Sequence, residues 1–415
     1  MPAYLERHAT SLITAALADT RVVVLNGARQ SGKSTLVHHL IRGIPDARER
    51  RLDQPIELSA ATFDPSRFVV HDGLLVIDEI QRAPELILPI KVRVDDDPRP
   101  GQYLLTGSAR LLGLRTLPDA LVGRKETIEL WPFSQAEIGG LISRFIDRLF
   151  DHELPAAESN GTGSCERDEY FRRIERGGFP EALQREGRRR MRFFSSYLED
   201  LVDRDVTQLG EIERREQLMR LLRLLAAGAG QIFVAERYAS QLGIAAKTVE
   251  RYVSLFEEVF LVKRVPAWSG SATNRATRAR KLMFVDSGLA TNLTGRSASR
   301  LSRGDELTGS HLENFVISEL ARLMPHADAD VRLFHYRTRD SVEVDAVIER
   351  SDGTIAGLEV KAADSVRADD LRGLSHLRDR AGSDFVAGAV LYTGPVVRSV
   401  GDRLWAVPID ALWTI

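Results

Sequence analysis

Residues 27–34 read GARQSGKS and match the phosphate-binding pattern G-x-x-x-x-G-K-[ST] in full. Glycines at both ends of the pattern let the backbone approach phosphate oxygens closely, and the loop amides and the following helix N-terminus supply a positive field. Lys33 is expected to reach the β- and γ-phosphates of a nucleotide, and the Ser34 hydroxyl to bind Mg²⁺. The sequence therefore predicts a nucleotide site made of Gly27, Ala28, Arg29, Gln30, Ser31, Gly32, Lys33, Ser34 and Thr35.

Two acidic residues, Asp78 and Glu79, end the apolar run LLVIDE downstream of this loop. An Asp at the end of a buried strand beside a phosphate loop can hold Mg²⁺ through water, and the adjacent Glu can orient a water molecule for hydrolysis. We therefore predict Asp78 as a metal ligand and Glu79 as a catalytic residue. Thr106 and Ser108, in YLLTGS, either sense the γ-phosphate or form an ordinary turn.

Positive charge is also expected at the transferring phosphoryl group, because arginine commonly stabilises the charge that develops there. Arg110, Arg115 and Arg124 are the candidates in the segment after this third apolar run. Most arginines of a globular protein are solvated surface residues, so position alone does not select one of them.

Three carboxylates and a lysine near the end of the chain have a second chemically suggestive spacing. Glu359 and Lys361 alternate along an expected strand and so project to one face. A hairpin through residues 351–353 would bring Asp345 beside them, and an expected helix offers Glu313. This D…E-x-K pattern predicts that the three carboxylates hold Mg²⁺ and that Lys361 orients a water attacking a phosphodiester. The alternatives are an inactive binding domain, or a strand face with an ordinary salt bridge.

Short apolar runs must position the nucleotide site. Residues 22–26, 74–79 and 103–106 are expected strands separated by helical stretches, and a helix is expected from 32 to 41. Strands that are apolar on both faces indicate a parallel α/β sheet covered by helices. We therefore predict an α/β P-loop domain over residues 1–135.

The middle of the chain is mostly helical in pattern, after a polar linker at 155–168. Residues 238–256 resemble a helix-turn-helix, whose second helix would carry four base-facing residues, Lys247, Thr248, Glu250 and Arg251. Between Glu258 and Asp286 there is no acid but six basic residues: Lys263, Arg264, Arg275, Arg278, Arg280 and Lys281. Such a stretch could bind DNA phosphates, or the region could serve as a rigid lid or protein contact.

Closely spaced strands are expected after residue 305, at 331–337, 342–349, 354–361 and 385–392. We accordingly divide the rest of the chain into a helical lid and linker at 136–230, a winged-helix-like region at 231–300 and a nuclease-like α/β domain at 305–415.

Composition limits the class of protein. The chain has 415 residues, with 57 Lys+Arg against 59 Asp+Glu, so it is not a wholly basic nucleic-acid-binding protein. Its single cysteine, Cys165, excludes an internal disulfide framework and multi-cysteine zinc sites. We find no apolar run long enough to cross a membrane and no clear secretory signal, and therefore expect a cytoplasmic protein without membrane contact.

Several blocks together resemble a known family. They are GARQSGKSTL, LLVIDEIQRAPEL, YLLTGSARLL, LVGRKETIELWPFSQAEI, HLENFVISEL and EVDAVIERSDGTIAGLEVKA. Their types and order are similar to those of prokaryotic AAA-type ATP-binding proteins with a conserved C-terminal domain of uncharacterised function, and this domain resembles the restriction-endonuclease-like PD-(D/E)xK fold. The resemblance implies ATP as the nucleotide and Mg²⁺ at Asp78. Gln81 and Arg124 match further family positions, and Arg124 becomes our catalytic arginine.

We therefore expect a Mg²⁺-dependent ATPase that acts as a switch for a nuclease-like domain meeting nucleic acid or a protein partner, with oligomer formation left open. One alternative is an ATP-regulated DNA endonuclease. The other is a non-hydrolysing scaffold or toxin–antitoxin-type component, in which ATP only orders the fold.

Overall fold

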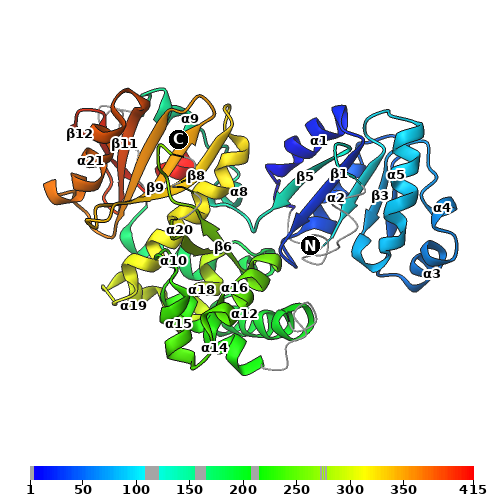
Figure 1. Ribbon diagram of the computed structural model, residues 1–415, viewed down its shortest axis with the longest axis horizontal. Helices are drawn as coiled ribbons and strands as arrows, with labels where there is room; N and C mark the ends of the chain where they lie inside the picture. Colours follow the sequence, from blue (N-terminus) through cyan, green and yellow to red (C-terminus); the bar gives the residue numbers. More distant parts are fainter. Residues whose placement is uncertain are drawn as a thin grey trace.

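The computed structural model describes residues 4–107, 121–154, 165–206, 215–271, 273, 275 and 278–415. Figure 1 shows a sheet with its helices at each end of the long axis and a mainly helical region beside them. Within the described ranges, no helix is both long enough and apolar enough to cross a membrane. The candidate residues Ser108, Arg110 and Arg115 lie outside these ranges.

The N-terminal domain is built on a five-stranded, all-parallel sheet in the order β2-β3-β4-β1-β5. Side chains of β1 alternate between two cores: Val22 and Val24 pack on the side of α5, and Val23 and Leu25 on the side of α1 and α2. Burial on both faces explains why this strand is apolar throughout, and the predicted parallel sheet is confirmed. The elements are α1 (Ala9–Asp19), β1 (Val22–Gly27), α2 (Lys33–Ile41), β2 (Arg48–Arg51), α3 (Pro55–Phe63), α4 (Pro65–Phe68), β3 (Leu75–Asp78), α5 (Ile87–Asp96), β4 (Tyr103–Thr106) and β5 (Lys125–Leu130).

The middle region has one apolar core. Leu218, Leu221, Leu222 and Leu225 form a buried stripe along α14, as the helical spacing of these leucines predicts. The helices α15 and α16 are joined through Gly243 in the left-handed conformation, and the antiparallel pair β6–β7 follows them. The elements are α10 (Arg167–Arg176), α11 (Pro180–Leu183), α12 (Gly187–Leu201), α14 (Arg215–Ala227), α15 (Ala235–Leu242), α16 (Ala246–Glu258), β6 (Val262–Val265), β7 (Lys281–Phe284), α18 (Ser287–Thr294) and α19 (Ala298–Ser302).

The C-terminal domain is a mixed six-stranded sheet in the order β12-β13-β11-β10-β9-β8. The pairs β8–β9 and β9–β10 are antiparallel, so the hairpin predicted through 351–353 is present, and β10–β11 and β11–β13 are parallel. The elements are α20 (Thr308–Leu323), β8 (Val331–Arg337), β9 (Glu343–Arg350), β10 (Ile355–Lys361), α21 (Arg372–Ala381), β11 (Phe385–Tyr392), β12 (Arg398–Gly401), β13 (Leu404–Pro408) and α22 (Ala411–Thr414).

The segment after the first domain packs differently from the predicted lid. Helices α8 (Gln135–Gly139) and α9 (Phe145–Phe150) share a core with the C-terminal sheet, to which α10 also contributes. Most of the buried apolar side chains described between Phe179 and Ala290 form the separate middle core, to which Ala28 of the phosphate loop also belongs. The predicted unit 136–230 is thus divided between two cores, because Phe145, Leu149 and Phe150 bury their side chains against the C-terminal domain rather than the middle region.

Candidate nucleotide site and a buried carboxylate cluster

The phosphate loop connects β1 to α2 and requires glycine at its first position. Gly27 has φ 144°, and a Cβ atom there would lie 2.2 Å from the carbonyl oxygen of Leu130 on the neighbouring strand. Gly32 has φ 99° and directly precedes α2. Both backbone conformations are unfavourable for residues with a side chain, so the motif glycines serve loop geometry as well as phosphate approach.

Lys33 is buried at the start of α2. Its ammonium group donates to the carbonyl oxygens of Gly27 (2.9 Å) and Ala28 (2.8 Å), which holds the side chain against the loop. Burial lowers the pKa of Lys33 to about 8, although the charges of Glu79 and Asp78 oppose this shift. A phosphate would restore the stability of the charged form, so the loop favours an anionic ligand.

Ser34 and Asp78 are brought together by the P-loop helix and β3. The Ser34 hydroxyl donates to Asp78 Oδ2 at 2.9 Å, and the Thr106 hydroxyl donates to the other carboxylate oxygen. A hydroxyl beside a carboxylate is a donor set that suits Mg²⁺, which usually takes one or two protein oxygens together with phosphates and water. The two predicted Mg²⁺ ligands, Ser34 and Asp78, are therefore adjacent, and the Thr106 hydroxyl is hydrogen-bonded to Asp78.

Glu79 follows β3 in the left-handed conformation, with φ 61°. The side-chain amide of Gln81 donates to a Glu79 carboxylate oxygen and so orients the carboxylate. Burial raises the pKa of Glu79, the nearby Asp78 charge raises it further, and Lys33 opposes both. A carboxylate with a raised pKa is a better proton acceptor, which suits the role predicted for Glu79.

The pocket at the loop has a volume of about 490 Å³ and is lined by two domains. The P-loop domain contributes the loop, the start of α2 and Glu79. The middle region contributes Pro180, Glu181, Arg185 and Phe193. The Tyr197 hydroxyl also donates to the carbonyl oxygen of Arg29 at 3.2 Å. Helices α11 and α12 therefore cover the site.

Arg124 is not at this pocket. In the parallel β1–β5 pair, Val22 lies opposite Lys125 and Gly27 opposite Leu130, so Arg124 precedes β5 at the end of the strands opposite to the loop. Five residues of strand correspond to roughly 17 Å. Arg124 instead pairs with Asp95, with Nη2 3.1 Å from Oδ2. The prediction that Arg124 acts at the phosphate site of its own chain is therefore wrong.

Two arginines that we did not predict support the site. Arg185 is paired with Glu181 and lines the pocket, and it also donates to the Glu181 carbonyl oxygen at 2.6 Å. Arg7 is 5% exposed and donates to Ser31 O (3.0 Å), Glu137 Oε1 (3.1 Å) and Trp131 O (2.5 Å), so it fixes the loop from behind. Neither lies in a motif, and in a chain rich in arginine nothing in the sequence selects them.

The predicted C-terminal carboxylates also meet. Because Ala346 pairs with Leu358, Asp345 lies opposite Glu359, and Asp345 Oδ2 accepts a hydrogen bond from the Val360 amide at 2.9 Å. Lys361 Nζ lies 2.9 Å from Glu359 Oε1. Burial raises the pKa of Glu359 to about 8, and the Asp345 charge adds to this effect while Lys361 opposes it.

A lysine from the middle region occupies the centre of this cluster. Lys281 of β7 is 1% exposed, and its ammonium nitrogen lies 2.5 Å from Glu313 Oε1, 3.0 Å from Asp345 Oδ1 and 3.0 Å from Glu343 Oε1. Although burial opposes the charged form, these carboxylates raise the pKa of Lys281. The ammonium ion takes the place at which we predicted Mg²⁺. Across the described residues, no group of three or more His, Cys, Asp or Glu side chains is arranged to hold a metal.

The predicted basic stretch is largely neutralised by acids that lie outside it in the sequence. Lys263 pairs with Glu129 at 2.5 Å and Arg275 with Glu349 at 2.6 Å. Arg264 pairs with Glu250 at 2.8 Å and also with Glu257. With Lys281 in the carboxylate cluster, Arg278 and Arg280 are the two members of the stretch without a carboxylate partner in the described structure.

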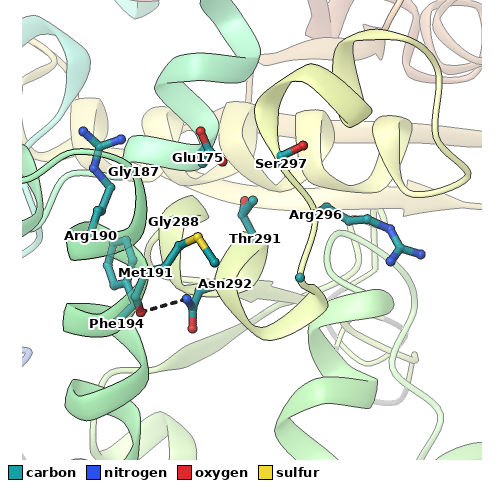
Figure 2. Close-up of a pocket in the computed structure, with 11 residues that line it drawn as sticks. Glu175, Gly187, Arg190, Met191, Phe194, Gly288, Thr291, Asn292, Arg296 and Ser297 are labelled. Carbon is teal, nitrogen blue, oxygen red and sulfur yellow. Dashed lines mark hydrogen bonds between the residues drawn. The ribbon is translucent and has the colours of Figure 1, made fainter.

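A smaller pocket lies between α10, α12 and α18 (Figure 2). Its volume is about 100 Å³, room for a few water molecules. Asn292 Nδ2 donates to the Met191 carbonyl oxygen at 3.1 Å, and Arg296 is paired with Asp305 at 3.1 Å. Two of its polar lining side chains are therefore already engaged in contacts within the protein.

The parallel sheet and the phosphate loop define a P-loop NTPase-like N-terminal domain. Residues 19–139 match the model of an AAA domain, 167–300 that of a domain of unknown function (DUF8612) and 308–412 that of another domain of unknown function (DUF4143). The restriction-endonuclease-like and winged-helix assignments of the sequence analysis thus remain proposals.

Curated relatives extend along the whole chain. The uncharacterized proteins Rv2008c of Mycobacterium tuberculosis and Mb2031c of Mycobacterium bovis are each 27% identical over 413 residues, which is 98% of this chain and 84% of theirs. Among solved structures, the Walker-type ATPase of Pyrococcus abyssi has 15% identity and a TM-score of 0.42, covering 70% of this chain and 96% of its own. A RuvB mutant of Thermotoga maritima has 17% identity and a TM-score of 0.29, covering 63% and 90%.

Proposed function

We propose that the protein is a Mg²⁺-dependent ATPase that acts as a molecular switch. The observation that carries this proposal is the shared pocket, in which the phosphate loop and Glu79 of one domain face Glu181 and Arg185 of another. A triphosphate bound in this pocket would contact both domains, and loss of the γ-phosphate would remove some of these contacts. Binding and hydrolysis would then favour different arrangements of the two domains.

Different residues of the chain have different roles in the proposed hydrolysis. The loop amides and Lys33 bind the phosphates, and Glu79, oriented by Gln81, accepts a proton from the attacking water. Ser34 and Asp78 would hold Mg²⁺, which when bound neutralises charge on the phosphates. We assign the charge-stabilising phosphate contact to Arg185 instead of Arg124. The Arg185 side chain lines the pocket and is only 30% exposed.

Replacing Lys33 by alanine tests the site. We expect wild-type protein to hydrolyse ATP with Mg²⁺ and the Lys33→Ala protein to lose both tight ATP binding and turnover, because its ammonium is the loop's point charge for the β- and γ-phosphates. Binding is measured by calorimetry and turnover by phosphate release. The matched control is Lys125→Ala, which changes a lysine at the start of β5, at the end of the strands opposite to the loop. Tight ATP binding by Lys33→Ala would overturn the assignment of Lys33.

The same assay tests Arg185. Arg185→Ala is expected to lower turnover by roughly 10²–10³-fold, the range for removing one charge-stabilising donor. Arg189→Ala, on the exposed face of α12, should change it little. Equal turnover in the two variants would exclude Arg185 from the transition-state contacts.

For the middle and C-terminal regions we retain contact with nucleic acid or a protein partner as part of the proposal. In the helix-turn-helix-like segment, Val249 and Tyr252 are buried while Lys247 and Arg251 are exposed on α16. Glu250 is held by Arg264, which leaves fewer groups for base contact than the sequence predicts. A DNA-contacting role for α16 therefore depends mainly on Lys247, Thr248 and Arg251.

An ATP-regulated DNA endonuclease is the second candidate function. It is supported by the adjacency of Asp345, Glu359 and Lys361 on β9 and β10. It is opposed by Lys281, since an ammonium ion among the carboxylates does not fit a bound Mg²⁺. We therefore derive no metal-dependent step at this cluster in the arrangement described.

Plasmid cleavage decides between these roles. If the region is a nuclease, wild-type protein should nick or cut plasmid DNA with Mg²⁺ or Mn²⁺, and Lys361→Ala should not. Dependence of cutting on ATP would indicate coupling of the two sites. Absence of cutting under all these conditions would favour a C-terminal domain that only binds its partner.

A further inference from the structure

A second large cavity lies between the middle region and the C-terminal sheet. Its volume is about 680 Å³, well within the range of ligand pockets. The walls come from the segment after β6, the residues before β7, the end of β8 and α21. Four arginines line this cavity against a single acid, Asp340; we call it the arginine pocket: Arg278, Arg337, Arg339 and Arg380.

Most of this positive charge is not compensated. Arg278 donates to the carbonyl oxygen of Arg337 at 3.1 Å, a contact that leaves its charge unpaired. Arg337 is 3.5 Å from Glu343, which it shares with Lys281. Within the part of the chain that the structure describes, neither Arg339 nor Arg380 forms an ion pair or a hydrogen bond. Convergent arginines in a concave site concentrate positive potential and attract anions.

The wall of the arginine pocket also carries polar atoms without partners. His335 Nδ1, Tyr336 Oη and His376 Nε2 are buried and have no hydrogen-bond partner among the described residues. His335 Nε2 lies 3.0 Å from the Ala279 carbonyl oxygen, so it is the donor and Nδ1 is left as an acceptor. Because these three atoms expose almost no surface to the cavity, the guanidinium groups are the polar contacts available to a ligand there.

The aromatic rings beside these atoms are tilted against one another in one wall of the pocket. Tyr336 lies between Trp268 and His376, with ring centroids 6.0 Å apart in each pair. Burial raises the pKa of Tyr336, and the charges of Arg380 and Arg278 oppose this rise. The guanidinium groups that line the cavity are donors of the kind that bind phosphate oxygens.

We propose that the arginine pocket binds a ligand that carries two or more phosphate groups, either a nucleic-acid strand or a free polyphosphate. Four guanidinium groups around a cavity of this size exceed what one phosphate needs, and bidentate arginine contacts suit phosphate geometry. Because Glu343 joins Arg337 to Lys281, a strand bound here would pass next to the carboxylate cluster. The inference deepens the proposed contact with nucleic acid and does not depend on ATP hydrolysis.

Binding of a labelled single-stranded DNA to the full-length protein, without ATP, tests the proposal by fluorescence anisotropy. The pocket variant is Arg339→Glu with Arg380→Glu, and the control is Arg332→Glu with Arg372→Glu, which places the same charge change at exposed sites of β8 and α21. We expect the pocket variant to bind at least about tenfold more weakly and to reduce the slope of log affinity against log salt by about 1 to 2. The control should stay within about threefold of wild type.

Calorimetric binding of inorganic pyrophosphate distinguishes the two sources of phosphate. For this measurement the wild-type, pocket-variant and control proteins all also carry Lys33→Ala, so that the phosphate loop does not bind the probe. Loss of DNA binding in the pocket variant assigns the site to a nucleic-acid strand, and loss of pyrophosphate binding alone assigns it to a free polyphosphate. Both variants should unfold at the wild-type midpoint. If wild type binds neither probe, or if pocket and control variants bind both probes equally, the proposal is wrong, whatever the ATPase assay shows.

Discussion

Replacing Glu79 by glutamine is expected to slow ATP turnover by about 10²–10³-fold while leaving ATP affinity nearly unchanged. A positioned general base contributes about 10²–10⁴-fold to a rate, and the glutamine keeps the size of the side chain but cannot accept a proton. Binding should persist because the phosphate contacts come from the loop and Lys33 rather than from Glu79. The measurement is single-turnover hydrolysis beside calorimetric ATP binding.

The control for this substitution is Glu85→Gln, an exposed carboxylate in the same segment that does not line the pocket. It should leave turnover and binding at wild-type values. Full turnover by Glu79→Gln would remove Glu79 from the reaction. If cellular function survives in a protein that no longer hydrolyses ATP, the scaffold alternative gains, since binding alone would then suffice.

Replacing Lys281 by methionine is expected to lower the free energy of unfolding by about 3–5 kcal/mol. Removing one partner of a buried ion pair leaves the other charge buried and uncompensated, and this is the usual cost. Here Glu313 and Asp345 lose their shared cation, and both are less than 10% exposed. Urea unfolding at neutral pH measures the loss.

Two further arms test the electrostatic origin of that loss. Lys281→Met combined with Glu313→Gln should recover much of the stability, because the second change removes one of the unpaired charges. Mn²⁺ should stabilise Lys281→Met more than wild type if the ammonium occupies a cation position. Lys263 lies on β6, the strand that pairs with β7, and forms a partly exposed ion pair with Glu129. Lys263→Met should therefore lower the free energy of unfolding by less than about 1 kcal/mol. Equal losses at Lys263 and Lys281, or no recovery in the double variant, would contradict this account.

Local segments of the chain could be predicted well. The phosphate loop is eight consecutive residues between a strand and a helix, so its geometry is set by the backbone preferences of Gly27 and Gly32 and by the apolar strand before it. The same holds for the β9–β10 hairpin, where alternation and a short turn suffice to bring Asp345 next to Glu359.

Features that depend on partners distant in sequence were either predicted wrongly or not predicted at all. Arg124 matches a family position, but the parallel register of β5 with β1 places it at the end of the strands opposite to the phosphate loop. The stretch from Glu258 to Asp286 contains no acid and yet is mostly paired, because Glu129 and Glu349 reach it from other domains.

The sequence by itself determined that this protein has a phosphate-loop motif between a strand and a helix of a parallel sheet, and that Ser34 and Asp78 are candidates for one site. These properties depend on short-range geometry and on patterns of burial. Only the tertiary structure decided that Arg185 lines the nucleotide pocket and that Lys281 occupies the carboxylate cluster. It also decided which arginines remain unpaired around a second cavity. Charge compensation acts through space over a few ångströms, and residues so close can be separated by a hundred positions in the chain.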